Sequence, residues 1–134
     1  MILKYKPGDV KSFTRVVEKE DTASFFGEEV HPVYATFALA RDVEWTSRLF
    51  VVEMRDADEE GIGTYVSVNH LASALVGEEI CIHSTIKKII GNEIICHYEV
   101  HVKDRKIAEG STGQKIIKKE KIKEIFEKIK NEKK

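Results

Sequence analysis

The chain has 134 residues, a length that suits a single domain over residues 1–134 and leaves no room for two catalytic domains. Its formal net charge of −1 at pH 7 is uneven, because residues 115–134 hold nine lysines and four glutamates. No stretch approaches the roughly 18 apolar residues that cross a bilayer, and Met1 leads into charged residues rather than a signal-peptide core, so we expect a cytoplasmic protein.

The first part of the chain combines one strand with a segment that carries aromatic residues. Val10–Glu18 has the β-forming residues of a strand. A short helical turn can follow over residues 21–27, where a capping residue precedes a glycine. Phe25 and Phe26 lie side by side in this stretch. Residues 17–35 therefore form either a lid-like segment over a pocket or a plug at one end of the core.

The one long helix predicted before the C-terminus runs from Thr36 to Met54. Its apolar residues occur on every side rather than in one stripe, which is typical of a helix buried within a domain. They are Phe37, Ala38, Leu39, Ala40, Val43, Trp45, Leu49, Phe50, Val51 and Val52. We therefore expect this helix to lie in the core.

Four long strands are predicted after the helix. Residues 61–63 open the first, whose alternation places Thr64, Val66, Val68 and His70 on one face. The valines mark that face as the inward one. Three consecutive antiparallel strands, separated by turn residues, then cover residues 80–90, 94–103 and 106–118.

The turn signal at residues 91–92 joins two of these strands into a hairpin. A three-residue loop over 91–93 matches apolar residues across the hairpin, whereas a two-residue loop opposes apolar to polar positions, so we predict the first register. It pairs Ile82, Ile86 and Ile90 with Val102, Tyr98 and Ile94. In either register Cys81 lies opposite residue 102 or 103, about 20 Å from Cys96 at roughly 3.3 Å per residue. We therefore expect two free, structural thiols in a reducing compartment.

The C-terminal segment 120–134 is predicted to form a basic amphipathic helix that docks on the sheet. Its apolar residues recur at helical spacing, at Ile122, Ile125, Phe126 and Ile129. Glutamates interrupt the lysines at intervals that favour pairing on a solvated helix face, so we expect neither nucleic acid nor a membrane as a partner. The order of elements predicts an α+β hot dog fold, an antiparallel sheet wrapped around one long central helix, with a short C-terminal helix.

A buried carboxylate in the long helix is the first candidate for chemistry. Glu44 lies between two apolar residues, where a carboxylate needs a hydrogen bond, a proton or a wet cavity. It is a candidate general base or nucleophile towards an acyl carbon. The alternative is a solvated Glu44 that pairs with Arg41 and Arg48. His70 shares the inward strand face and is the candidate partner in proton transfer; the alternative is a satisfied core histidine.

Thr36 stands at the start of the long helix, where threonine commonly serves as an N-cap. A helix start also presents N–H groups that suit a thioester oxygen becoming an oxyanion, so Thr36 is a candidate for positioning a substrate. It lies about 12 Å from Glu44 along the axis, so the two must line one pocket from different positions, with His70 supplied from the same chain or across a subunit boundary. Gly63 either relieves backbone strain or lets a substrate approach closely.

No metal site is predicted from the spacing of possible ligands. His97 and His101 share a strand face but lie about 13 Å apart, too far for one ion. No cysteine and histidine spacing indicates zinc, and the sequence contains neither a glycine-rich phosphate loop nor a nucleophile-elbow motif.

The chain resembles the hot dog thioesterases of the fluoroacetyl-CoA thioesterase-like family. The resemblance covers nearly the whole domain and is carried by Asp21–Gly27, Val33–Thr36, Val43–Trp45, Gly63, Val68–Ala72 and Gly110. The separations of Thr36, Glu44 and His70 fit the family without gaps. The resemblance implies that these three are catalytic: Glu44 attacks the thioester or activates water, His70 transfers a proton and Thr36 polarises the substrate.

The resemblance also implies an assembly and a substrate. It implies a homodimer whose sheets join edge to edge, with acyl-CoA bound in clefts at the subunit boundary, and it leaves open whether dimers pair into a dimer of dimers. Gly63 matches a glycine near the acyl group. No metal or redox cofactor is implied, and coenzyme A enters only as part of the substrate.

Two departures from the family pattern bear on the substrate. Gln114 stands where family members often have an arginine, and Val30 corresponds to the aromatic lid of the fluoroacetate-specific enzyme. We therefore expect a short or medium acyl-CoA rather than fluoroacetyl-CoA, bound near Phe25, Phe26, Val30, Gly63 and Gln114.

The prediction is thus a cytoplasmic acyl-CoA thioesterase. Its rivals are a hot dog hydratase or dehydratase, which would use the carboxylate and histidine for proton transfer, and a non-catalytic acyl-CoA or lipid-binding module. The chain is rich in lysine, glutamate and isoleucine and has a single glutamine, which is typical of thermophilic proteins.

Overall fold

The computed structural model describes residues 1–25 and 28–132, and at residues 24, 25, 29 and 30 it describes the backbone alone. The elements are β1 (Val10–Val16), a 3-10 turn η1 (Lys19–Asp21), β2 (Thr22–Phe25), β3 (Glu28–Tyr34), α1 (Thr36–Met54), β4 (Glu59–Val66), β5 (Asn69–His70), β6 (Glu79–Ile90), β7 (Glu93–Val102), β8 (Arg105–Lys118) and α2 (Lys119–Glu132). The main sheet is antiparallel with the order β1-β6-β7-β8-β4, and β5 also pairs with β8, whereas β2 and β3 pair with each other.

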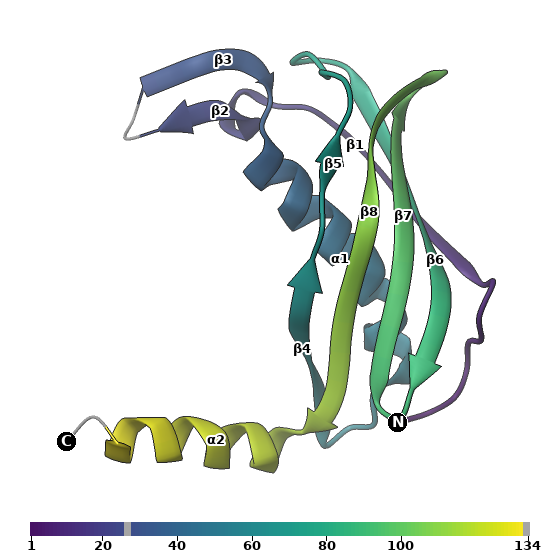
Figure 1. The fold of residues 1–134 in the computed structure, drawn as a ribbon, viewed down its shortest axis with the longest axis vertical. Coiled ribbons are helices and arrows are strands. Elements are labelled where there is room, and N and C mark those ends of the chain that lie inside the picture. The colour runs from purple at the N-terminus through teal and green to yellow at the C-terminus, as the bar shows by residue number, and fades with distance from the viewer. Residues whose placement is uncertain (26–27, 133–134) are drawn as a thin grey trace.

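The sheet curls around α1, which crosses its concave side (Figure 1). The β2–β3 pair projects from one end of the sheet and α2 from the other, both on the side where β4 and β5 lie. This arrangement confirms the predicted hot dog fold: a curled antiparallel sheet, one long central helix and a short C-terminal helix.

One face of α1 forms the core with the sheet. Two apolar clusters lie along the helix, one around Leu39 and Val43 and the other around Phe50 and Met54. Buried hydroxyl groups connect this helix to the sheet. Ser47 Oγ, on α1, forms a hydrogen bond with Ser84 Oγ at 2.8 Å and accepts one from Thr112 Oγ1 at 2.7 Å. Buried hydroxyls need such partners, and these bonds join α1 to β6 and β8.

The prediction that α1 is buried on all sides is wrong. Its bounds are those predicted, but Phe37, Trp45 and Val52 are 51%, 44% and 40% exposed, and Glu44 is also exposed. The sheet covers only one side of the helix, so the apolar residues on the other side remain open within a single chain.

The predicted hairpin register is also wrong. Ile90 pairs with Glu93 across a two-residue turn, and an irregularity between Ile86 and Lys88 then places Ile82 opposite Val100. The extra residue on β6 shifts the register by one and restores apolar pairing beyond a short turn. Cys81 therefore lies opposite His101 rather than opposite residue 102 or 103. Both cysteines are free thiols, as predicted.

The segment over residues 17–35 differs from its prediction. The helical turn lies at Lys19–Asp21, before the predicted position, and Thr22–Phe25 form a strand instead. The earlier start has a local cause, because Glu18 is the N-cap of the turn and its backbone N–H donates to the Asp21 carboxylate at 2.9 Å. Phe26 and Gly27 lie outside the described residues, as do the side chains of Phe25 and Val30.

A buried ion network joins this segment to α1 and β1. Arg15 contacts Asp21 and Asp42 at 2.8 Å each, and Arg41 contacts them at 2.9 and 3.0 Å. The Tyr34 hydroxyl donates to Asp42 Oδ2 at 2.5 Å. Burial alone would raise the pKa of Asp21, but hydrogen bonds from Arg15 and Arg41 outweigh it and hold that pKa below its ordinary value.

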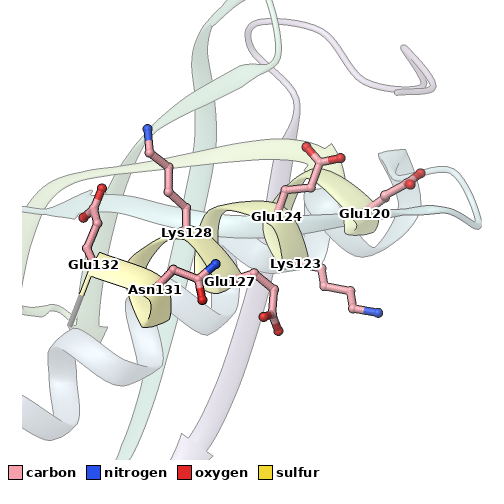
Figure 2. Close-up of a pocket in the computed structure, with 7 residues that line it drawn as sticks. All are labelled: Glu120, Lys123, Glu124, Glu127, Lys128, Asn131 and Glu132. Carbon is pink, nitrogen blue, oxygen red and sulfur yellow. The ribbon is translucent and has the colours of Figure 1, made fainter. Parts of the chain in front are cut away.

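The predicted docking of the C-terminal helix on the sheet is wrong. None of the side chains of α2 is buried, and Ile125, Phe126 and Ile129 are 40% to 53% exposed. The polar side of the helix bounds a groove of about 710 Å³, lined by Glu120, Lys123, Glu124, Glu127, Lys128, Asn131 and Glu132 (Figure 2). All seven come from one helix, so the groove has no opposite wall and is a poor candidate for a ligand site.

Across the part of the chain that the structure describes, no helix is both long and apolar enough to cross a membrane.

Candidate functional site

The structure brings Thr36 and His70 into direct contact. Thr36 Oγ1 lies 2.9 Å from His70 Nδ1. Thr36 is the first residue of α1 and Ala35 is its N-cap, so the threonine hydroxyl is not used to cap the helix. His70 is held by the β5–β8 pair, in which it lies opposite Ala108. The hydrogen bond therefore fixes the imidazole against the start of the helix.

The other ring nitrogen of His70 is buried and has no hydrogen-bond partner among the described residues. Burial lowers the pKa of His70 below its ordinary value of 6.5, and a weaker backbone interaction with Ala72 opposes that shift. The imidazole is therefore neutral at pH 7. If Nδ1–H donates to Thr36, Nε2 has a free lone pair and can accept a proton.

Glu44 contacts the strand that follows α1. Its Oε1 lies 2.6 Å from the position that a Cβ atom would take on Gly63, so the carboxylate occupies the space that glycine leaves. A small cavity of about 200 Å³ adjoins it, lined by Glu44, Gly63, Thr64, Tyr65 and Val66. The carboxylate is thus exposed to a small concave site rather than enclosed in the core.

The predicted ion pairs of Glu44 are not formed. Arg48 pairs with Glu60 at 2.8 Å, and Arg41 contacts Asp21 and Asp42 in the buried network. The alternative for Glu44 is therefore right about its exposure to solvent and wrong about its ion pairs, since both arginines are used by other carboxylates.

Gln114 supports the backbone at this site. It is 4% exposed, lies opposite Gly63 in the β4–β8 pair, and its amide donates to the Glu44 carbonyl at 3.1 Å. Gln114 therefore links the helical turn that carries Glu44 to the strand that carries Gly63. Sequence reasoning singled out Gln114 because family members often have an arginine there, but it did not predict the contact with the Glu44 carbonyl.

Sequence reasoning missed Tyr65. An irregularity in β4 between Gly63 and Tyr65 interrupts the simple alternation, and Tyr65 is 43% exposed at the cavity. The signal that could have indicated this irregularity is Gly63, two residues before Tyr65, since glycine within a strand often marks a bulge.

The candidate residues form two separate pairs. The described contacts join Thr36 to His70 and Glu44 to Gly63, and none joins Glu44 to His70. Thr36 and Glu44 are eight residues apart on α1, about 12 Å along its axis. Direct proton sharing between Glu44 and His70 of one chain is therefore not found in this part of the structure.

Among the described residues, one group of possible metal ligands lies elsewhere, on β7 and β8. His97, Glu99 and Glu109 present ligand atoms within 4.8 Å of one another. The ammonium of Lys106 lies 2.7 Å from each of the two carboxylates. Sequence reasoning considered cysteine and histidine spacing and so did not find this group, in which one lysine already offsets part of the negative charge of two carboxylates.

Replacement of Gly63 tests whether the position of the carboxylate matters. For the acyl-CoA hydrolysis that the family resemblance implies, we expect Gly63→Ala to lower turnover on the order of tenfold or more, because the new methyl group displaces Glu44 Oε1 and small displacements at a reacting centre are costly. Stability should change little, since the atom displaced is the end of a flexible side chain. Steady-state kinetics and thermal unfolding measure both effects.

Gly61→Ala is the matched control for that variant. A Cβ there would lie 2.5 Å from Val51 Cγ1 in the core, so this change should lower the melting temperature instead. Unchanged kinetics in folded Gly63→Ala would contradict a role for the carboxylate at this position.

The chain is similar to one protein family and to several solved structures. The model of the family described as fluoroacetyl-CoA-specific thioesterase matches residues 17–120. A solved thioesterase superfamily member from Thermus thermophilus is 33% identical, with a TM-score of 0.90 over 97% of both chains. A variant of the fluoroacetyl-CoA-specific thioesterase FlK, in complex with fluoroacetate and CoA, is 20% identical, with a TM-score of 0.82 over 88% of this chain and 99% of that chain.

A further solved structure, a hot-dog-like protein from Thermanaerovibrio acidaminovorans, is 16% identical, with a TM-score of 0.82 over 91% of both chains. A search of curated proteins gave no match. The structural similarities confirm the hot dog fold.

Proposed function

Because the chain belongs to the fluoroacetyl-CoA-specific thioesterase family, we propose that it is an acyl-CoA thioesterase, which hydrolyses a short or medium acyl-CoA to the carboxylic acid and free CoA. The observation that carries this proposal is the Thr36–His70 hydrogen bond, which leaves a buried, unpartnered Nε2 on a neutral imidazole. Glu44 beside Gly63 supplies the carboxylate that the reaction needs.

The proposed chemistry divides the work among three residues. Glu44 either attacks the thioester carbon, giving an anhydride that water then hydrolyses, or takes a proton from the attacking water. His70 accepts and returns a proton through Nε2, which is buried in one chain and so needs a local movement to reach the substrate. Thr36 orients the imidazole and lies at the start of α1, where backbone N–H groups suit the developing oxyanion.

We propose that a homodimer completes the site. β4 and β5 each pair only with β8 among the described strands, so this sheet edge is open in one chain. Trp45, next to Glu44 in the chain, is exposed, and Tyr65 is exposed at the cavity. A second copy joined along this edge would cover these aromatic side chains and bring Glu44 of one chain towards His70 of the other. Light scattering gives the mass in solution, and a monomer would contradict this assembly.

The substrate proposal follows from the departures from the family pattern. The hollow of about 200 Å³ at Gly63 is one wall of a site that a second copy would complete, so it does not set the length of the acyl group. Val30 and Gln114 differ from the residues that are common at these positions in the family, which argues against fluoroacetyl-CoA as the natural substrate. The free thiols Cys81 and Cys96 suit a reducing, cytoplasmic compartment.

A panel of acyl-CoA substrates tests the function. Free CoA released from acetyl-, butyryl-, hexanoyl- and longer acyl-CoA is followed with a thiol indicator, against buffer alone. We expect turnover to be highest for the shorter chains. Hydration of an enoyl-CoA without thiol release would instead favour the hydratase alternative.

A binding module is the second candidate, and Gln114 favours it. The buried amide replaces a charged family residue and is used to hold the Glu44 backbone. Calorimetric binding of acyl-CoA without hydrolysis above the buffer rate would establish this candidate and exclude the thioesterase.

The proposed role of His70 predicts a pH dependence. Its pKa is lowered by burial, so the neutral base is present at pH 7 and is lost only as the pH falls through a value below 6.5. We expect the acidic limb of kcat/KM that depends on His70 to lie below that value. NMR titration of the imidazole, assigned by its loss in His70→Gln, measures the pKa directly. A value above 6.5 in the free protein would contradict the buried geometry.

A further inference from the structure

A thiol and an imidazole lie together on the side of β6 that faces away from the core. Cys81 and His83 alternate with the buried residues Ile80 and Ile82, so their side chains share the outer face of the strand. Cys81 Sγ lies 3.3 Å from His83 Nε2. His83 is exposed and Cys81 is partly exposed, so reagents can reach both side chains.

The neighbouring strand orients the imidazole. Ser12 of β1 lies opposite His83, and its Oγ is 2.7 Å from His83 Nδ1. When Nδ1–H donates to the serine oxygen, the lone pair of Nε2 points at the sulfur and can accept the thiol proton. A nucleophile, a base and a group that orients the base are thus in place, which is the arrangement of an activated nucleophile.

A cavity gives access to this thiol. About 660 Å³ of space is bounded by Cys81, His83 and His101 and by the charged residues Glu78, Glu79 and Lys103, together with Gly77 and Val102. It shares no lining residue with the cavity beside Glu44. The site is therefore distinct from the one proposed for acyl-CoA hydrolysis.

The second cysteine provides an internal comparison. Cys96 is 1% exposed, and burial raises its pKa, although nearby hydroxyls of Ser84, Ser47 and Thr112 oppose that shift. A thiol that is buried and protonated reacts slowly, because the thiolate is the nucleophile. The two thiols of one chain therefore lie in opposite environments.

We propose that Cys81 is a reactive thiol that exchanges with small-molecule disulfides, with His83 as its base and Ser12 as the residue that positions His83. The thiol proton moves to His83 Nε2, and the Cys81 thiolate attacks one sulfur of the disulfide. A new disulfide forms between Cys81 and that sulfur while the original bond breaks. The second half leaves as a thiolate and takes the proton from the imidazolium, so one thiol is consumed and one is released.

The test follows the reaction of the native protein with dithiobis-nitrobenzoate, an aromatic disulfide whose released thiolate absorbs light. We expect one thiol per chain to react rapidly. The rapid phase should persist in Cys96→Ser and disappear in Cys81→Ser. Retention of the rapid phase in Cys81→Ser would overturn the assignment.

Two further variants separate activation from simple exposure. His83→Gln should slow the rapid phase about tenfold or more near neutral pH, and Ser12→Ala should slow it less, because the imidazole remains. As the pH is lowered, the reaction of the wild type with the disulfide should also slow at a lower pH than the reaction of His83→Gln. Equal rates and equal pH profiles in the wild type and His83→Gln would overturn the role of the imidazole. Both substitutions are at the surface, and circular dichroism checks that the variants are folded.

The inference does not depend on the proposed hydrolysis. Cys81→Ser should hydrolyse acyl-CoA at the rate of the wild type, since Cys81 contributes nothing to the cavity at Glu44. It also removes a protein thiol that would otherwise consume a disulfide indicator of CoA release.

Discussion

Glu44→Gln should lower the turnover of acyl-CoA by about a hundredfold or more, while leaving the fold intact. The amide keeps the size of the side chain but can neither attack an acyl carbon nor accept a proton from water. Because Glu44 is exposed and makes no ion pair with any residue that the structure describes, its loss should have little effect on unfolding. Steady-state kinetics with the best acyl-CoA of the panel measure the effect.

Glu53→Gln is the matched control for this variant. Glu53 is also on α1, but its carboxylate contacts Lys4, Lys11 and Tyr5, away from the cavity at Gly63. It should retain the turnover of the wild type. An undiminished rate in folded Glu44→Gln would end the proposed role of this carboxylate, even if the protein proves to be a thioesterase.

Asp42→Asn should lower the free energy of unfolding by about 2 to 3 kcal/mol. The change removes one of two carboxylates from the buried network and leaves Arg15 and Arg41 with Asp21 alone. Breaking a buried ion pair commonly costs 3–5 kcal/mol, and we reduce this figure because the Arg41 side chain is 55% exposed. Urea unfolding followed by circular dichroism measures the difference.

The control for Asp42 is an ion pair at the surface. Asp58 pairs with Lys118 at 2.9 Å, and both side chains are more than half exposed, so Asp58→Asn should change stability far less. If Asp42→Asn unfolds at the same urea concentration as the wild type, the network does not hold the residue 17–35 segment to the helix as we infer.

The sequence was sufficient for the long elements and their order, but not for the β2–β3 pair, whose residues were predicted as a lid-like segment with a helical turn. The bounds of α1 are those predicted, and β6, β7 and β8 begin and end within a residue of their predictions. Local patterns specify such elements, because periodicity and turn residues act over short distances. The hairpin register could not be obtained in this way, since it depends on one irregularity between Ile86 and Lys88 that no local signal marks.

The candidate site was predicted by residue but not by geometry. Spacing and resemblance indicated Thr36, Glu44 and His70, yet the contact between Thr36 and His70 joins residues 34 positions apart in the chain. The same limit applies to Arg48, which pairs with Glu60 of β4, and to Arg41, which pairs with Asp21 of η1 and with its helix neighbour Asp42. Helical spacing shows which partners are within reach, whereas tertiary packing determines which of them bind.

The C-terminal helix has a consequence for local dynamics. Its 14 residues bury no side chain, so packing does not add to the backbone hydrogen bonds that hold it. Isolated helices of this length are marginally stable in water. Its amide protons should therefore exchange with deuterium through fraying, at a low opening free energy, while those of β7, in the middle of the sheet, wait for global unfolding.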